Sequence, residues 1–506
     1  SAPSAPSAPS APSAPSAPSA PSAPSAPSTS IRRKRKHRRI YLYKNMGIRN
    51  QAVKGGFIMV IRQGLGILLS LASVIFITRV IGPKQYGLFG AASGILTFLY
   101  RLGPWGLDVY LVRKTENPEQ EEYNQAFTIL LGVSLVFSLG VILGRDAIAS
   151  FLRIKEISPL LLALAFTIPP FLLKVPSTAK LERDLNFQRI AFNELISQIS
   201  YYIIAIPMAF QGAGAWSPVV GLLVQNYVLF ILTQAGAKLK LGLYWNPELA
   251  KEIVSFGFTF SASSWAWELR TLVNPVIVGR FAGAEAVAFV ALAIRLVEML
   301  SFVRYIAWRL AIAALAKFKE NKDRLRSSVE EGMHLLSLSV GLPMAGFSLV
   351  GPMILSIVFG KNWDPVLEIY PFVAVSYIAY SVLNLHTSVL YLLGKNMRVT
   401  WFNLIHVILF VGTAFLLVPR IGMIGYGWAE LCTLVSYIVL HSYVAKEIGT
   451  PNYTTALIWF TLSISVLLIG TLESPLRYFS VLLFLLPLIS TKERKNLWGY
   501  YQILRS

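Results

Sequence analysis

Residues 125–144 of this 506-residue chain read QAFTILLGVSLVFSLGVILG, twenty positions without a charged side chain. A helix needs about 20 such residues to cross the roughly 30 Å hydrocarbon core of a bilayer. Similar blocks recur along the chain, where 55% of residues are hydrophobic and only 14% are charged. Soluble domains carry about 25% charged residues. The sequence therefore excludes an ordinary multidomain soluble protein and predicts an all-α polytopic membrane protein.

About fourteen blocks are candidates for membrane-spanning helices. We expect them at residues 56–79, 87–107, 125–144, 158–175, 190–210, 215–234, 254–279, 286–308, 333–358, 369–393, 400–418, 423–445, 453–472 and 476–490. The longest loop that this count places on the outer side is about 13 residues long, near 145–157. Such short loops disfavour a membrane enzyme, because a polymerase or ligase would carry its catalytic groups on a long outer loop.

Composition divides the chain into six parts. The N-terminus is nine copies of Ser-Ala-Pro plus three further residues, and proline at every third position favours an extended, disordered chain. We expect the following parts: 1–30, the disordered tail; 31–54, a basic cytoplasmic arm; 55–235, a six-helix bundle; 236–447, a second six-helix bundle; 448–490, two additional transmembrane helices; and 491–506, a cytoplasmic C-terminal tail.

The formal net charge of +21 has a topological explanation. Cytoplasmic loops of membrane proteins retain Lys and Arg. Of the 46 Lys and Arg, ten lie in the arm 31–54, 21 in loops that the helix count places in the cytoplasm, and nine in the alternate loops. This ratio favours fourteen crossings with both termini in the cytoplasm. For the basic arm it favours contact with membrane lipids and no binding of nucleic acid.

A short duplication relates the two predicted bundles at an offset of 201 residues. Residues 79–89, RVIGPKQYGLF, align with residues 280–290, RFAGAEAVAFV, so that Gly82 matches Gly283. We expect each segment to form an outward turn between two helices. An even number of helices separates the turns, which predicts two bundles related by a pseudo-twofold axis along the membrane normal.

Several segments resemble one membrane-protein family in their order and spacing. They are VIGPKQYGLF at 80–89, LG at 102–103, GL at 106–107, LVRK at 111–114, KLERDLNFQR at 180–189, IVGRFAG at 277–283, FGKNWDP at 359–365 and IGMIG at 421–425. Residues 50–450 thereby resemble polysaccharide exporters of the multidrug/oligosaccharidyl-lipid/polysaccharide exporter superfamily. The chain departs from the family at Ala313 and Ala314, where a proline commonly closes the eighth helix. The resemblance implies a flippase for lipid-linked oligosaccharides, with two bundles around a central cavity.

Six arginines fall inside predicted spans, where a charge costs about 2.5–3.5 kcal/mol and usually faces a cavity or a partner. Arg309 lies near a cytoplasmic helix end, from which its side chain can reach the membrane surface. Arginine suits the binding of pyrophosphate because its planar donors chelate phosphate oxygens. The expected substrate-binding residues are Arg101, Arg270 and Arg295, with Arg62 and Arg304 as secondary candidates. The alternative is that these charges neutralise one another between helices.

Carboxylates accompany these arginines at different spacings. Glu298 follows Arg295 by three residues, which allows a pair within one helix. Asp108 follows Arg101 by seven, about two turns along the same face. Glu268 and Arg270 are only two residues apart, so their side chains diverge toward different partners. Arg295 and Arg304 are nine residues apart, on opposite faces of a straight helix.

Three carboxylates are candidates for coupling transport to a gradient of H⁺ or Na⁺: Asp108, Glu268 and Glu298. Trp265 and Trp267 are candidates for stacking against sugars, although packing is the usual role of tryptophan in a membrane protein. Cys432 is the only cysteine, and the histidines have no metal-like spacing. The sequence also has no Walker motif. We therefore expect no catalytic residues, no metal site and no bound cofactor.

Together these features predict a bacterial inner-membrane transporter rather than an enzyme. The resemblance implies that it moves polyprenyl-pyrophosphate-linked oligosaccharide units to the outer leaflet, for exopolysaccharide or O-antigen synthesis, by alternating access through an arginine-lined cavity. Its expected partners are that glycan lipid, membrane lipids and a polysaccharide polymerase with other export machinery. A drug/cation antiporter of the same superfamily is the alternative, although cavity arginines would repel cationic substrates. A polysaccharide polymerase or ligase is the second alternative.

Overall fold

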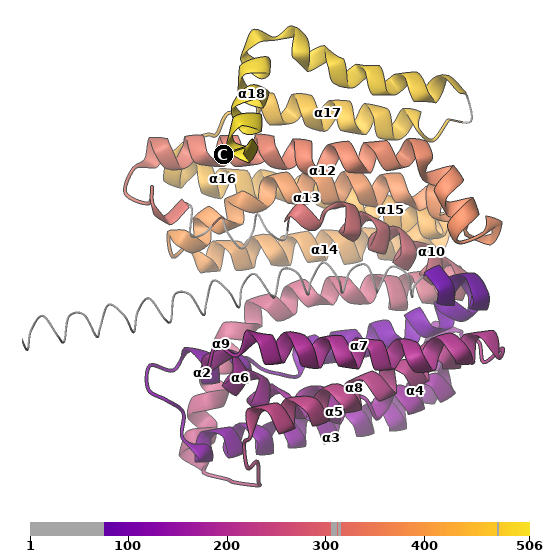
Figure 1. Cartoon of the computed structure of the whole chain (residues 1–506), viewed down its shortest axis with the longest axis vertical. Helices are drawn as coiled ribbons and strands as arrows, with labels where there is room; N and C mark the ends of the chain where they lie inside the picture. Colours follow the sequence, from indigo (N-terminus) through magenta and orange to yellow (C-terminus); the bar gives the residue numbers. More distant parts are fainter. Residues whose placement is uncertain (1–74, 305–310, 312–314, 473–474, 506) are drawn as a thin grey trace, which may run out of the picture. The chain divides into compact units, whose positions relative to one another are not determined.

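The computed structural model describes residues 75–304, 311, 315–472 and 475–505. All regular structure in these ranges is helical, and they contain no strand (Figure 1). The predicted tail 1–30, the basic arm 31–54 and the candidate residue Arg62 lie outside the described residues. Arg309 also lies outside them.

The first half of the chain begins with helical residues 75–102. The helices that follow are α2 (Leu107–Arg113), α3 (Gln120–Leu152), α4 (Ile157–Ala165), α5 (Ile168–Leu173), α6 (Val175–Arg183), α7 (Phe187–Phe210) and α8 (Trp216–Ala237). α7 and α8 lie side by side, and α3 packs against α4 and α5 (Figure 1). These helices bury a common apolar core that includes Leu107, Leu130 and Leu161.

The second half runs from residue 247 and ends with three further helices. Its elements are α9 (Pro247–Glu268), the 3₁₀ turn η1 (Leu269–Leu272), the π-helical turn η2 (Val273–Val278), α10 (Gly279–Leu300), α12 (Lys322–Val358), η3 (Lys361–Trp363), α13 (Val366–Leu392), α14 (Asn396–Ile421), α15 (Met423–Cys432), η4 (Thr433–Val435), α16 (Ser436–Ile448), α17 (Thr454–Ile469), η5 (Pro475–Ile489) and α18 (Thr491–Arg505). α13 packs against α10, α12 and α15, so it lies at the centre of this half. α17 packs along α12 (Figure 1).

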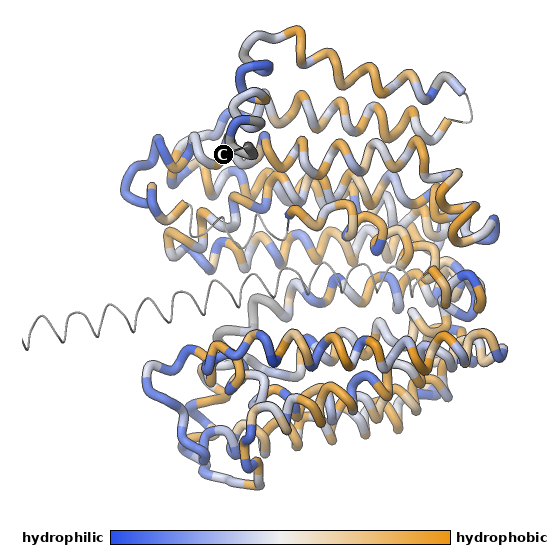
Figure 2. Tube along the Cα trace, viewed as in Figure 1, coloured by the Kyte–Doolittle hydropathy of each residue, from blue (hydrophilic) through white to orange (hydrophobic). Residues whose placement is uncertain are grey.

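Eight helical segments within the described residues are long and apolar enough to cross a membrane. They are Gln120–Leu152, Ile157–Arg183, Trp216–Ala237, Trp265–Leu300, Lys322–Val358, Val366–Leu392, Asn396–Ile421 and Met423–Ile448. Apolar residues run along these segments, and polar residues concentrate at their ends and in the loops (Figure 2). Large apolar side chains on their outer faces remain exposed, such as Leu143 at 81% and Ile408 at 67%. A surface of this kind is suited to lipid, and the chain is a multi-pass membrane protein, as the sequence predicts.

Two predicted segments differ from the structure in detail. The block expected as one helix at 158–175 is divided among α4, α5 and α6, because prolines stand in the first turns of α5 and α6. The long loop expected at 145–157 is shorter, since α3 continues to Leu152 and α4 begins at Ile157. At 1.5 Å per residue, the 33 residues of α3 span about 50 Å, so the helix can extend beyond the hydrocarbon with Arg145 and Asp146 still helical.

The duplicated segments share an unusual backbone conformation as well as sequence. Gly82 has φ 77° and Gly283 has φ 86°, both in the left-handed region that favours glycine. Gly283 also has ψ 177°, and it divides α10 into two helical stretches that meet at a kink. The aligned glycines therefore break the helix at matching positions of the two halves.

Candidate functional site

A cavity of about 1780 Å³ lies between the first half, which contributes helical residues 75–102 and Arg113 of α2, and several elements of the second half. The second half contributes residues of α9, η1, η2, α10, α13, α14 and α15 to its wall. Pockets for drug-sized ligands measure about 300–1,000 Å³, so this cavity has room for a larger molecule. Its aromatic residues are Tyr86, Phe89, Phe256, Trp267, Tyr377, Tyr380, Tyr391 and Tyr426.

Six ionisable residues with opposite formal charges line the same cavity. They are Arg113, Arg270, Arg304, Glu268, Glu298 and Glu430. The described lining is thus balanced in formal charge, whereas the sequence suggests a wall dominated by arginine. The geometry of each pair decides which of these charges is available to a ligand.

Arg270 is bound to a buried carboxylate. Its Nη2 donates to Oε2 of Glu430, a residue only 1% exposed on the adjacent helix α15. Ser376 donates to the same oxygen at 2.8 Å, and Tyr426 donates to Oε1 at 3.0 Å. Every oxygen of Glu430 therefore has a donor, and the group joins η1, α13 and α15.

Arg304 lies over two tyrosines instead. Its guanidinium carbon is 5.0 Å from the ring centroid of Tyr377 and 4.9 Å from that of Tyr380. Both rings come from one face of α13, because the two residues stand three positions apart. Cation–π contact of this kind holds a guanidinium without neutralising its charge.

The structure brings some of the expected site residues into the cavity and leaves others outside. Those that line it are Arg270, Arg304, Trp267, Glu268 and Glu298. Arg101, Arg295, Trp265 and Asp108 are not part of the described lining. Trp267 stacks on Tyr380 at a centroid distance of 5.8 Å, while Trp265 packs against Phe258 at 5.3 Å. The binding roles of all these residues stay predictions.

The spacing arguments from the sequence have mixed outcomes. Arg295 and Glu298 form the expected i,i+3 pair, with Nη1 and Oε2 3.9 Å apart. α10 ends at Leu300, so a break at Ser301 separates Arg295 from Arg304. The expectation that Arg101 and Asp108 share a helix face is wrong. Residues 103–106 form a turn, in which Trp105 has φ 49°, and Asp108 belongs to the separate helix α2.

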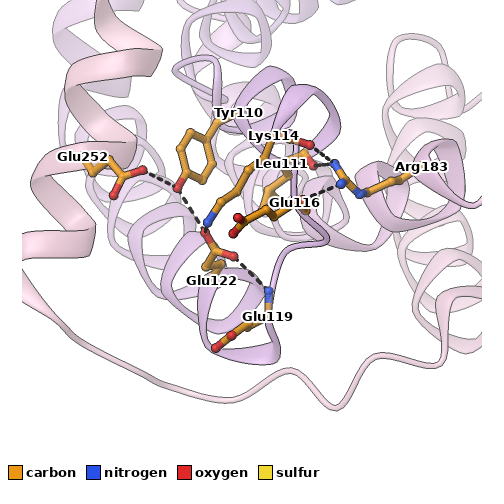
Figure 3. A network of polar contacts seen from close by, with 8 residues as sticks. All are labelled: Tyr110, Leu111, Lys114, Glu116, Glu119, Glu122, Arg183 and Glu252. Atoms are coloured by element: carbon orange, nitrogen blue, oxygen red, sulfur yellow. Dashed lines mark hydrogen bonds and ion pairs between the residues drawn. The ribbon is translucent and has the colours of Figure 1, made fainter. Parts of the chain in front are cut away.

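A polar network connects α2, α3 and α9, on the side that the sequence predicts to be cytoplasmic (Figure 3). The hydroxyl of Tyr110 lies 2.9 Å from Oε1 of Glu252 and 3.1 Å from Oε1 of Glu122. Lys114 donates to Glu122, and this hydrogen bond raises the pKa of Lys114. Burial, and then the two carboxylates, raise the pKa of Tyr110. Helices α2 and α3 are thereby tied to α9, at the start of the second half.

The backbones of the two halves approach each other closely at two places. A β-carbon on Gly257 of α9 would lie 1.8 Å from the carbonyl oxygen of Trp105. At the turns that the sequence predicts on the outer side, a β-carbon on Gly87 would lie 1.8 Å from the carbonyl oxygen of Ala284. Real β-carbons do not approach so closely, so only glycine permits these contacts.

Comparison with known families assigns the chain to a class of proteins. The profile of a family described as polysaccharide biosynthesis proteins matches residues 76–368, more than half of the chain. The chain belongs to this family. The match includes the duplicated turns and the cavity residues from Tyr86 to Arg304, and it confirms the resemblance to polysaccharide exporters.

The names of two relatives of this chain describe a role in polysaccharide biosynthesis or transport. The lipopolysaccharide biosynthesis protein WzxC of Escherichia coli K12 is 22% identical over 405 residues, which are 78% of this chain and 82% of the relative. The succinoglycan biosynthesis transport protein ExoT of Rhizobium meliloti is 20% identical over 377 residues, 71% of this chain and 76% of the relative. Similarity thus extends over most of each relative, including both halves.

A solved structure confirms the fold of this chain. The lipid II flippase MurJ, in an inward closed conformation, superposes with a TM-score of 0.69. The match covers 90% of this chain and 100% of MurJ at 15% sequence identity. At this identity the comparison supports the all-helical architecture and not the chemistry of the cavity.

The sequence gives weak signals for the cavity residues that are not among the expected binding residues. Glu430 stands in an apolar block, and a carboxylate in such a position requires a partner. Arg270 is 160 residues away, so spacing within one helix could not reveal the pair. Tyr377 and Tyr380 are two of 22 tyrosines, and only the fold places them beside Arg304.

Proposed function

We propose that the protein is a flippase that moves polyprenyl-pyrophosphate-linked oligosaccharide units from the cytoplasmic to the outer leaflet of a bacterial inner membrane. Its family membership supports a role in polysaccharide biosynthesis, and the name of ExoT supports transport. The observation that carries the proposal is the cavity of about 1780 Å³, which combines aromatic walls with an arginine held on tyrosine rings.

Each part of such a substrate has a suitable environment. Sugar rings stack on aromatic faces, and the cavity wall offers eight aromatic side chains. Pyrophosphate oxygens accept hydrogen bonds from arginine, whose charge persists when it is removed from water. The polyprenyl chain needs no pocket because it is as apolar as the bilayer. Only the headgroup then has to enter the cavity.

The transport cycle that we propose is alternating access. The two halves rock about the cavity, so that it opens first to the cytoplasm and then to the outer side, with both termini in the cytoplasm. Arg62, Arg101, Arg295 and Trp265 are candidates for contact with the headgroup in other steps of this cycle. A gradient of H⁺ or Na⁺ resets the protein through Asp108, Glu268 or Glu298, and a polysaccharide polymerase receives the product.

One observation favours the second candidate, a drug/cation antiporter. The cavity contains three glutamates, and Glu268 forms no ion pair with any described residue. A cationic substrate would be attracted to such a carboxylate. It would also meet Arg304, which has no neutralising partner within the described residues, and this repulsion makes the antiporter the weaker candidate.

Reconstitution distinguishes these functions. The full chain is placed in proteoliposomes with a fluorescent polyprenyl-pyrophosphate oligosaccharide, and an impermeant reagent that destroys the label reports the fraction in the outer leaflet. We expect transbilayer movement at least tenfold faster than in empty liposomes. Movement no faster than in empty liposomes, combined with efflux of a cationic dye driven by a proton gradient, would replace the flippase with the antiporter.

A further inference from the structure

The two arginines that the second half contributes to the cavity have different surroundings. We propose that Arg304 binds the pyrophosphate group of the lipid-linked saccharide, and that Arg270 is a positioning residue that holds the cavity wall through Glu430. The inference rests on the proposed function and assigns residues to its substrate. It changes the order expected from the sequence, in which Arg270 is a primary ligand and Arg304 a secondary one.

The surroundings of Arg270 leave little of its charge for a ligand. Its guanidinium pairs with Glu430 and lies over the rings of Trp267, at 5.5 Å, and Phe410, at 5.1 Å. Glu430 has no second cation within ion-pair distance among the described residues. A phosphate that took Arg270 away would leave this carboxylate buried and unpaired, which is strongly unfavourable.

The same contacts explain what Arg270 does instead. Glu430 also accepts hydrogen bonds from Ser376 of α13 and Tyr426 of α15, so the ion pair connects three elements of the cavity wall. Trp267 lies three residues before Arg270 and stacks on Tyr380, one of the rings that support Arg304. The ion pair of Arg270 with Glu430 thereby fixes the position of the aromatic rings that contact Arg304.

Arg304 has the opposite surroundings. No carboxylate of a described residue lies within ion-pair distance of its guanidinium. Glu298, another carboxylate of the lining, has Arg295 as its partner. Cation–π contact with Tyr377 and Tyr380 does not consume the N–H groups of Arg304, and the guanidinium has no hydrogen bond to a described residue. Those groups have the fork geometry that chelates two phosphate oxygens.

The residues beside Arg304 are also suited to a sugar phosphate. Asn384 lines the cavity one helical turn after Tyr380 on α13, and its amide can both donate and accept hydrogen bonds. The phenol groups and Trp267 provide flat surfaces for sugar rings. Arg304 thus combines a positive charge that forms no ion pair with a described residue with neighbours suited to the adjoining saccharide.

Binding to the full chain in nanodiscs tests this assignment. The probes are undecaprenyl pyrophosphate and undecaprenol, which share the tail and differ only in the charged group. Variants are Arg304→Gln, Arg304→Lys, Arg270→Gln, Glu430→Gln and the double variant Arg270→Gln/Glu430→Gln. Arg420→Gln, at the exposed end of α14 outside the cavity, is the control. The thermal unfolding midpoint of each variant is measured in parallel.

We expect Arg304→Gln to weaken pyrophosphate binding about 10- to 100-fold without changing undecaprenol binding or the unfolding midpoint, since it removes charge-assisted hydrogen bonds to the ligand. Arg304→Lys should recover part of this affinity. Arg270→Gln and Glu430→Gln should each lower the unfolding midpoint. The double variant should restore the midpoint and bind pyrophosphate within about threefold of the native chain, because it removes both charges together.

Two results overturn the assignment. Native affinity in Arg304→Gln would remove Arg304 from the site, and a double variant as defective as Arg304→Gln would make Arg270 a ligand. A failure of the proposed function looks different: the native chain itself would bind pyrophosphate no better than undecaprenol. The unfolding midpoints would still test the role of the Arg270–Glu430 pair in that case.

Discussion

Arg183 shows how one side chain can organise a loop. From α6 its guanidinium donates to the carbonyl oxygens of Leu111, Lys114 and Glu116 (Figure 3). It also donates to the carbonyl oxygen of Val112. The distance to the oxygen of Lys114 is 2.7 Å. These carbonyls belong to the last turn of α2 and the residues after it, where no intrahelical donor is available. A single arginine therefore caps α2 from another helix.

Replacing Arg183 tests this capping role. We expect Arg183→Ala to reduce the free energy of unfolding by about 2 kcal/mol, because several carbonyl groups lose a charged donor. The measurement is the thermal unfolding midpoint in detergent. Lys180→Ala on the same helix is the matched control, since among the described residues Lys180 forms only an exposed pair with Asp184 at 2.9 Å. Equal midpoints for the two variants would contradict the capping role.

Tyr110→Phe tests the contact between α2 and α9. The variant removes the hydroxyl that lies 2.9 Å from Glu252 while it keeps the buried ring. We expect the predicted cytoplasmic end of the cavity to open more often. A cysteine at Thr271, in a chain with Cys432→Ser, should then react several-fold faster with an impermeant maleimide added from the cytoplasmic side.

The control for this measurement is Tyr478→Phe, which loses an exposed contact to Arg477 far along the chain. An unchanged labelling rate in Tyr110→Phe, equal to that of the control, would show that the hydroxyl does not hold this end closed.

At the residue scale the sequence predicts local pairs and misses distant ones. The pair of Arg295 with Glu298 follows from three-residue spacing on a helix. The pairs of Arg270 with Glu430 and of Tyr110 with Glu252 join residues 160 and 142 positions apart, which only the packing of helices can bring together. The role of Arg304 depends likewise on α13, and charge in a span indicates only that some partner or cavity exists.

At the scale of elements, α9 is the connection between the two halves. It packs against α2 and α3 of the first half and against α14 of the second half. Asn246 at its start accepts bonds from the backbone of Glu248 and Leu249, which caps the helix, while its own N–H donates to Gln125 of α3 at 2.7 Å. A movement of the halves must therefore change the contacts of this helix.

Two alanine variants should open opposite ends of the cavity. Gly257→Ala forces α9 away from Trp105, and Gly87→Ala forces the first half away from Ala284, since each added β-carbon would lie 1.8 Å from a carbonyl oxygen. With a cysteine at Thr271, we expect faster maleimide labelling from the cytoplasmic side in Gly257→Ala and from the outer side in Gly87→Ala.

Gly140→Ala of α3 is the control for both variants, because an added β-carbon there meets no atom within 4 Å. Labelling from both sides at the rate of Gly140→Ala would show that these glycine contacts do not control access to the cavity.

Helix breaks are harder to predict than helices. Apolar blocks locate the spans because hydrocarbon requires a minimum length of apolar helix. The break at Ser301 arises inside the apolar block 286–308, where hydropathy gives no signal, whereas Gly283 lies between two predicted blocks. The alignment of Gly82 with Gly283 does indicate the turn at Gly283, since both glycines have a positive φ.

At the scale of the whole molecule, charge has two separate distributions. Most Lys and Arg belong to the basic arm and the loops, as expected from topology, and the net charge of +21 says little about the substrate. Within the described cavity lining, three arginines face three glutamates. The chemistry of the site thus depends on which of these charged side chains form ion pairs with each other. The amino-acid composition does not reveal these pairs.

The rate of transbilayer movement tests the central claim most directly. Native chain, Arg304→Gln and Arg420→Gln are reconstituted at equal density in proteoliposomes that contain a labelled polyprenyl-pyrophosphate oligosaccharide. We predict that the native chain and Arg420→Gln move the lipid at similar rates, at least tenfold above empty liposomes, and that Arg304→Gln reduces the protein-dependent rate at least tenfold. Movement by Arg304→Gln at the native rate would contradict the role of Arg304, and movement by the native chain at the rate of empty liposomes would contradict the flippase itself.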